Sequence, residues 1–156
     1  MSLEPLETAS GSDYPLCRQL SVFVENRLGQ LLRLTRLFDN AEVKILAVSV
    51  EGATDCAIVR LLVNDPDLGH QVLSDAHFAV TECDVLVIEL PEGRRAIRSV
   101  CEALIGGEVN MNYIYPLFPL SNLGKCVAIQ VDNLTQGAAA LAARKFNLID
   151  QSELLG

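Results

Sequence analysis

The second half of this chain repeats the pattern of apolar residues found in the first half. A shift of 66 residues aligns the alternating apolar positions of a first strand in each half: Leu20 with Leu86, Val22 with Ile88, and Val24 with Leu90. Farther along, the shift becomes 68 residues, and Phe78 falls on Phe146. Self-similarity at a fixed period indicates that each repeat is one structural unit. We therefore predict two units, at residues 18–84 and 85–156, preceded by a flexible tail at residues 1–17.

Each unit is predicted to have the order strand, helix, strand, strand, helix, strand. In the first unit, apolar residues alternate along the first strand and recur every three or four residues along the first helix. Asp65 and Pro66 suit the N-cap and the first position of the second helix. The predicted strands lie at residues 20–25, 43–50 and 57–63 and from residue 78, and the helices lie at residues 31–38 and 65–76.

This order predicts an α+β fold made of two ferredoxin-like βαββαβ units. In such a unit, two helices cover one face of a four-stranded antiparallel sheet. Right-handed crossovers give the strand order 4-1-3-2, which leaves the second strand at an edge. Because an unpaired edge strand invites pairing with another strand, we expect the two second strands to lie side by side. The two units would then share one antiparallel sheet of eight strands.

Two motifs that stand in register with the repeat resemble those of the ACT domain family. The first unit reads Asn-Arg-Leu-Gly-Gln-Leu at residues 26–31, where the family commonly has Asn-Arg-Pro-Gly-x-Leu between the first strand and the first helix. The family's Gly-Ile-Asn-Ile at the second strand corresponds to residues 42–45, where Lys44 replaces Asn. In the second unit, Asn110 matches that Asn, but the turn at residues 91–97 departs from the family pattern. The resemblance covers about residues 19–154.

The resemblance implies a regulatory protein that senses an amino acid and has no catalytic activity. ACT domains typically bind amino acids between two copies, where the first turn of one copy faces the second strand of the other. We therefore expect the ligand to bind between the two repeats. The predicted ligand-binding residues come from the first turn and from the second strand of the second unit: Asn26, Leu28, Gly29, Gln30, Asn112 and Tyr113.

Elementary chemistry supports a binding role for the first turn. A strand that runs into a helix presents free backbone N–H groups and the positive end of the helix dipole, which suits a carboxylate. Gly29 lets a ligand approach the backbone, and Asn26 offers both donors and an acceptor. The alternative is that Asn26 caps the helix and Gly29 eases the turn. In the second unit, Glu92 and Arg95 occupy the corresponding positions, so we expect one working site.

Three arginines follow the second turn, at positions 94, 95 and 98. They could form an anion site, but cations at a helix N-terminus oppose the dipole. We interpret them as a solvated helix face.

The composition argues against several classes of function. A net charge of −8 at pH 7 disfavours nucleic acids and anionic membrane surfaces as partners. Five cysteines at wide spacings, without a Cys-x-x-Cys pair, predict reduced thiols and a cytoplasmic location. Two histidines, and the absence of phosphate-loop or His-Glu-x-x-His motifs, argue against an enzyme. We expect no metal and no cofactor.

The partners that remain are an amino acid, a second copy of the chain and a biosynthetic enzyme. Phe23, Ile58, Val85 and Val87 are predicted to lie on the sheet face without helices, and an apolar face of this kind predicts a homodimer. The small regulatory subunits of acetolactate synthase are a looser resemblance, which leaves open a regulatory subunit of a biosynthetic enzyme. A purely structural dimerisation module is the third alternative.

Overall fold

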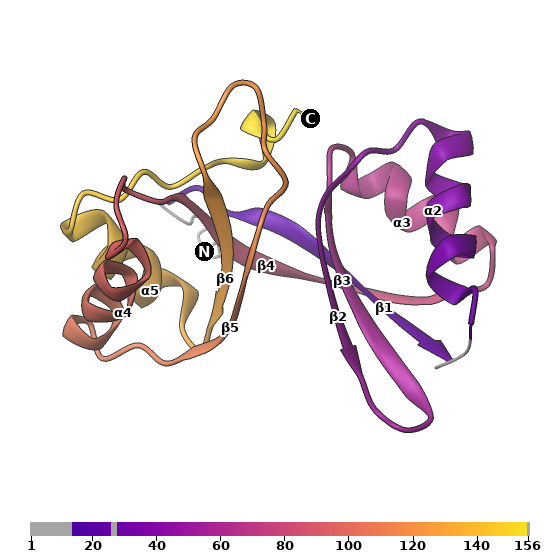
Figure 1. Cartoon of the computed structure of the whole chain (residues 1–156), viewed down its shortest axis with the longest axis horizontal. Coiled ribbons are helices and arrows are strands. Elements are labelled where there is room, and N and C mark those ends of the chain that lie inside the picture. The colour runs from indigo at the N-terminus through magenta and orange to yellow at the C-terminus, as the bar shows by residue number, and fades with distance from the viewer. Residues whose placement is uncertain (1–13, 26–27, 156) are drawn as a thin grey trace, which may run out of the picture.

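The computed structural model describes residues 14–25 and 28–155, and it forms four layers with helices at both ends and strands between them (Figure 1). Most of the predicted tail, and Asn26 of the predicted site, lie outside the described residues. The first unit consists of β1 (Cys17–Glu25), α2 (Gln30–Ala41), β2 (Ile45–Gly52), β3 (Cys56–Val63), α3 (Pro66–Asp75) and the first part of β4 (Ala79–Glu89). The second unit consists of the rest of β4, α4 (Ala96–Gly106), β5 (Met111–Pro116), β6 (Cys126–Val131), α5 (Leu134–Ala143) and the short 3-10 helix η1 (Gln151–Glu153).

The strands pair in the order β2-β3-β1-β4-β6-β5, and every neighbouring pair is antiparallel. In the first unit this is the predicted 4-1-3-2 order. In the second unit, Leu148 bridges to Ile88 of β4, and the Ile149 N–H donates to the Val87 carbonyl at 2.8 Å. Residues 147–149 therefore occupy the place of a fourth strand, and both units have the same order.

The predicted joining of the two units by their second strands is wrong. The two units instead share β4, whose residues 79–85 pair with β1 and whose residues 86–89 pair with β6. Residues 78–90 contain no glycine or proline, so the extended chain runs straight from one unit into the next. β2 and β5 end at opposite edges of the strand order, and the sheet has six strands.

The helix-free faces of the two units pack against each other and bury a core of their own. Val85 and Val87 of β4 are fully buried in this inter-unit core, together with Leu46, Leu62, Tyr115 and Ile149. Part of the apolar face for which the sequence predicts a homodimer is therefore buried within the chain. Phe23 remains 45% exposed and Ile58 is half-buried, so the homodimer itself stays a prediction.

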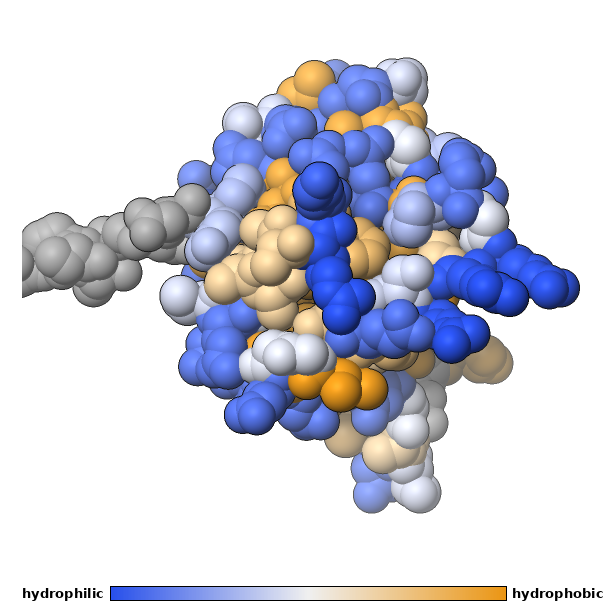
Figure 2. Space-filling view, turned by 90° about the vertical axis from the view of Figure 1, so that its left-hand side faces the viewer, coloured by the Kyte–Doolittle hydropathy of each residue, from blue (hydrophilic) through white to orange (hydrophobic). Residues whose placement is uncertain are grey.

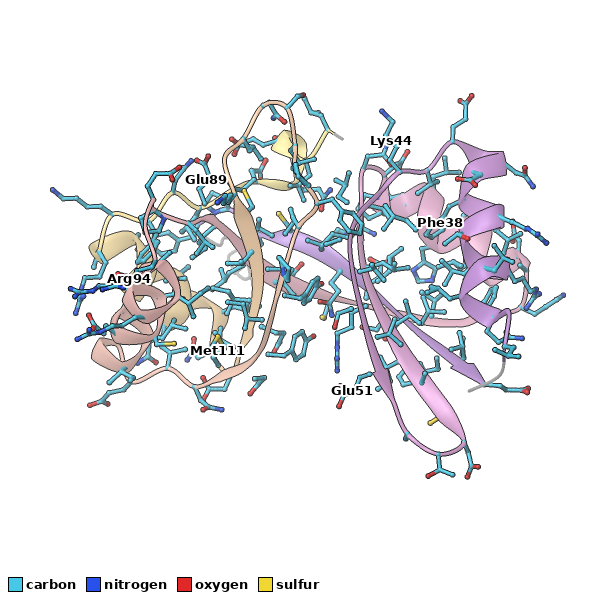
Figure 3. The ribbon with its side chains drawn as sticks, viewed as in Figure 1. Phe38, Lys44, Glu51, Glu89, Arg94 and Met111 are labelled. Carbon is cyan, nitrogen blue, oxygen red and sulfur yellow. The ribbon has the colours of Figure 1, made fainter. Side chains whose placement is uncertain are left out.

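Two further cores lie between the sheet and the helices, one in each unit. Leu20 and Val22 point into the first and Leu86 and Ile88 into the second, as the alternation predicts, and all four are fully buried. Phe38 of α2 is buried beneath its helix at the right of Figure 3. The helix-facing side of each unit is therefore the side that the sequence pattern indicates.

The backbone repeats with the same shifts as the sequence. Glu42 and Glu108, which are 66 residues apart, both have left-handed φ angles, of 61° and 56°. His77 and Lys145, which are 68 residues apart, have φ angles of 68° and 66°. Left-handed conformations are uncommon for residues other than glycine, so their recurrence at equivalent positions confirms two copies of one unit.

Within the described part of the chain, no helix has the length and apolar character needed to cross a membrane. The same residues also contain no group of three His, Cys, Asp or Glu side chains that could hold a metal ion.

Candidate ligand-binding site

The first strand-to-helix turn leaves an open space beside Gly29. β1 ends at Glu25 and α2 begins at Gln30. Gly29 is the N-cap of α2 with φ 86°, a left-handed conformation that favours glycine. Among the described residues, a Cβ atom at this position would meet no atom within 4 Å, and the side chain of Leu28 is fully exposed. The backbone of the turn is therefore accessible, as the sequence predicts.

The helix that follows the first strand of each unit lacks the side-chain cap that the other helix has. Asp65 accepts a hydrogen bond from the Leu68 N–H at 3.1 Å at the start of α3, and Asn133 accepts one from the Gln136 N–H at 3.0 Å at the start of α5. Among the described residues, no such hydrogen bond is made by the N-cap residue of α2 or α4. The free backbone N–H groups in the first turns of α2 and α4 can therefore donate hydrogen bonds to a bound anion.

A hollow of about 230 Å³, which we call the first hollow, lies beside the first turn. It carries opposite charges, from Glu25 at the end of β1 and Arg33 on α2. The Arg33 guanidinium donates to the Ala76 carbonyl at 3.0 Å and lies 4.5 Å from the centroid of the Phe78 ring. This arginine narrows the space above Phe78. The lining residues are Phe23, Val24, Glu25, Gln30, Arg33, His77, Phe78 and Ala79.

The second unit has a hollow at the equivalent place, which we call the second hollow, with a volume of about 570 Å³. Ser99 stands at the position of Arg33, so a short side chain replaces the arginine that lies above the phenylalanine ring in the first hollow. Lys145 stands at the position of His77. The lining residues are Glu89, Leu90, Pro91, Glu92, Ser99, Gly124, Lys125, Arg144, Lys145, Phe146 and Asn147.

Arg95, which stands at the position of Gly29, does not line the second hollow. Arg95 is the N-cap of α4 and its side chain is exposed. The left-handed glycine of this turn is Gly93, with φ 106°, two residues before the position that corresponds to Gly29. The second turn therefore reaches its helix by a different path and keeps the hollow open.

Glu89 is held at the rim of the second hollow by hydrogen bonds. Its carboxylate accepts from the Gly124 N–H at 2.7 Å and from the Asn147 side-chain amide (Figure 3). The hydrogen bond from the Gly124 backbone, with that from Asn147, lowers the pKa of the Glu89 carboxyl. Glu89 is therefore ionised at neutral pH, and its oxygen atoms already have protein donors.

Asn112 and Tyr113 lie far from the first turn within one chain. The Asn112 side chain donates to Gln130 at 2.6 Å on the exposed surface. The Tyr113 hydroxyl accepts from the Gln19 side chain at 2.8 Å. Gln19 lies six residues before Glu25 on β1, so the extended strand separates Tyr113 from the turn by about 20 Å. The structure does not bring the two halves of the predicted site together in one chain.

Tyr113 and Tyr115 instead belong to a buried polar cluster between the two units. Gln19 is fully buried, and the Tyr115 hydroxyl donates to its side-chain oxygen at 2.5 Å. Cys83 accepts from the Gln19 amide at 3.4 Å, and the Arg60 guanidinium lies 4.0 Å from the centroid of the Tyr113 ring. Burial raises the pKa of Tyr115 and of Cys83. The sequence pattern does not point to Gln19, because its partners come from distant strands.

Replacing Gln19 with alanine is expected to lower the free energy of unfolding by about 1–3 kcal/mol, because the buried Tyr115 hydroxyl loses its acceptor. Urea denaturation measures the change. The matched control is Gln71→Ala, since Gln71 donates to Asp75 on the exposed face of α3, and it should change the stability by no more than about 0.5 kcal/mol. Equal stability of the two variants would contradict a structural role for the cluster.

A family model described as an ACT domain pair matches residues 16–156. No curated protein matches the chain. The crystal structure of protein BT0572 from Bacteroides thetaiotaomicron is similar, with 30% identity, a TM-score of 0.83 and coverage of 92% of this chain and 99% of that chain.

Two regulatory subunits of aspartate kinase share the fold at lower identity. The subunit from Thermus thermophilus has 13% identity and a TM-score of 0.57, and the alignment covers 86% of this chain and 94% of that chain. The subunit from Thermus flavus has 9% identity and a TM-score of 0.57, with coverage of 85% and 93%. The family match spans nearly all of the described residues, and the resemblance seen in the sequence is confirmed. The chain belongs to the family of ACT domain pairs.

Proposed function

We propose that this protein is a regulatory sensor of an amino acid, without catalytic activity, and that the first turn of the first unit binds the ligand. The single observation that carries the proposal is the first hollow, where an accessible helix start lies beside side chains of opposite charge. An ACT domain pair is a regulatory module, and regulatory subunits of aspartate kinase share its fold. Both findings support a sensing role.

The charges of the first hollow suit a zwitterion. The N–H groups at residues 28–30 and the Arg33 guanidinium would hold the ligand's carboxylate, and the Glu25 carboxylate would hold its ammonium group. The volume of about 230 Å³ is below the range of roughly 300–1,000 Å³ that is usual for small-molecule sites. We therefore expect an amino acid with a small side chain. Asn112 would meet this turn from a second copy of the chain, in the proposed homodimer.

A thermal-shift panel of the twenty amino acids tests the proposal. At about one hundred times its dissociation constant, a ligand that binds only the folded state stabilises it by about 2.7 kcal/mol, which raises the melting temperature by several degrees. Small amino acids should give this shift, whereas tryptophan and phenylalanine should not. If no amino acid shifts the melting temperature, the dimerisation-module alternative is favoured.

Gly29→Val locates the binding site. Valine has room at this position but not the left-handed backbone, so the variant should be destabilised by about 1–2 kcal/mol and still fold. The displaced turn should no longer respond to the amino acid. Gly52→Val is the control, because a Cβ atom there also meets nothing within 4 Å and the backbone is not left-handed. An unchanged affinity in Gly29→Val would show that the turn is not the site.

A further inference from the structure

The second hollow has the size and the charge of a separate binding site. Its volume of about 570 Å³ lies within the range of roughly 300–1,000 Å³ that is usual for sites of small molecules. It lies between the end of β4, the start of α4, the segment before β6 and the segment after α5. Because it is formed by the second unit alone, it is independent of the site proposed for the first turn.

Two lysines from separate segments bring positive charge to the second hollow. Lys125 precedes β6 and Lys145 follows α5, whereas the guanidinium of Arg144 lies beside Gly106, in the groove between α4 and α5. Within the described part of the chain, neither lysine takes part in an ion pair. They gather in one place although the whole chain has a net charge of −8. Figure 2 looks onto the second unit from the side of α4 and α5, where strongly hydrophilic side chains (deep blue) stand beside a paler, weakly apolar patch.

Two carboxylates, Glu89 and Glu92, also line the second hollow. The Glu89 oxygen atoms are already hydrogen-bonded to the Gly124 N–H and to the Asn147 side chain. The two lysines have no ion-pair partner among the described residues, whereas Glu89 already has protein donors. A ligand with two negative groups could place one at each lysine, whereas the lysines would repel the ammonium group of a zwitterion.

The two hollows differ at the residue that lies above the phenylalanine ring. In the first hollow, Arg33 covers Phe78, whereas in the second hollow the short side chain of Ser99 stands at the equivalent position, beside Phe146. We propose that the second hollow binds a small dianion, of the class that includes dicarboxylates and phosphates, through Lys125 and Lys145. Charge-assisted hydrogen bonds from lysine and arginine to such oxygen atoms are about twice as strong as neutral ones.

Calorimetric titration of the full chain with succinate and, separately, with inorganic phosphate tests the proposal. We expect saturable binding of at least one of these dianions, and the two titrations show whether the carboxylate or the phosphate is preferred. Lys125→Gln and Lys145→Gln should each raise the dissociation constant at least tenfold. The lysines are chosen because Arg144 also borders the groove between α4 and α5.

Two further variants separate a defined site from a general attraction of anions. Arg36→Gln removes one positive charge from the exposed surface of α2 and should leave the dissociation constant within a factor of two. Ser99→Arg reproduces the first unit's arginine in the second hollow. It adds a positive charge, yet it should abolish dianion binding because the side chain would occupy the space above Phe146.

Several results would overturn the proposal. These are wild-type affinity in both lysine variants, equal weakening by Arg36→Gln, tighter binding by Ser99→Arg, or no binding of either dianion by the wild-type chain. The outcome is distinguishable from that of the amino-acid proposal. Ser99→Arg should keep the thermal response to small amino acids, and Gly29→Val should keep the binding of the dianion.

Discussion

Replacing Phe38 with alanine is expected to lower the free energy of unfolding by about 3–5 kcal/mol, the usual cost of truncating a buried aromatic side chain. Phe38 is 1% exposed and packs in the core beneath α2 with Leu34, Val43 and Leu73. The loss combines the transfer free energy of the ring with the cavity that it leaves. Because domains are stable by only about 5–15 kcal/mol, this change removes a large part of the total. Chemical denaturation followed by circular dichroism measures it.

Leu32→Ala is the matched control on the same helix. Leu32 is 52% exposed, so its truncation removes little buried surface and should change the stability by no more than about 0.5 kcal/mol. If the two variants lose the same stability, α2 does not pack on the sheet through the face that carries Phe38.

The sequence predicts the fold of each unit because burial follows a simple period. Leu20 and Val22 alternate with the more exposed Ser21 and Phe23, and both are buried under the helices as expected. The shifts of 66 and 68 residues that align the apolar positions also relate the left-handed residues of the backbone, so the pattern of apolar residues alone is enough to align the two units. The period of the apolar residues depends only on whether a segment is a helix or a strand, so it can be recognised from the sequence.

The arrangement of the two units does not follow from the sequence in the same way. Alternation shows that Val85 and Val87 face away from the helices, but it does not show what covers them. The apolar face predicts that a second chain covers the two valines, whereas in the structure both are buried between the two units of one chain. The long β4 strand decides the outcome, because it pairs with β1 along one part and with β6 along the other.

The candidate site follows from the sequence only in part. Gly29 does adopt the left-handed turn that its residue type suggests, and the turn is accessible. The difference between Arg33 and Ser99 is visible in the sequence, but its meaning depends on Phe78 and Phe146, which arrive from a distant part of each unit. Only the folded chain shows that these residues share a hollow.

The second large effect is expected at the glycines that let each unit's second helix approach the sheet. A Cβ atom at Gly137 of α5 would lie 3.0 Å from a methyl group of Val131 and 3.3 Å from one of Leu86. At Gly69 of α3, the corresponding distances are 3.3 Å to Val63 and 3.1 Å to Leu20. These contacts fall on equivalent residues of the two units, so both positions face the same constraint.

Gly137→Val is expected to lower the free energy of unfolding by about 3 kcal/mol, at the upper end of the usual cost of overpacking a core. A single added methyl, in Gly137→Ala, asks its neighbours to move by a few tenths of an ångström, and a gain in helix propensity of about 1 kcal/mol partly offsets that cost. Valine adds two more carbon atoms to the same contact, so the offset no longer suffices and α5 must move away from the sheet. Gly106→Val is the control, because a Cβ atom there would meet only the flexible end of Arg144, at 3.6 Å. Urea denaturation should rank Gly137→Val far below Gly106→Val, with Gly69→Val close to Gly137→Val. If all three variants are equally stable, α3 and α5 do not pack on the sheet through these glycines. The close approach of helix and sheet at Gly69 and Gly137 would then not stabilise the fold.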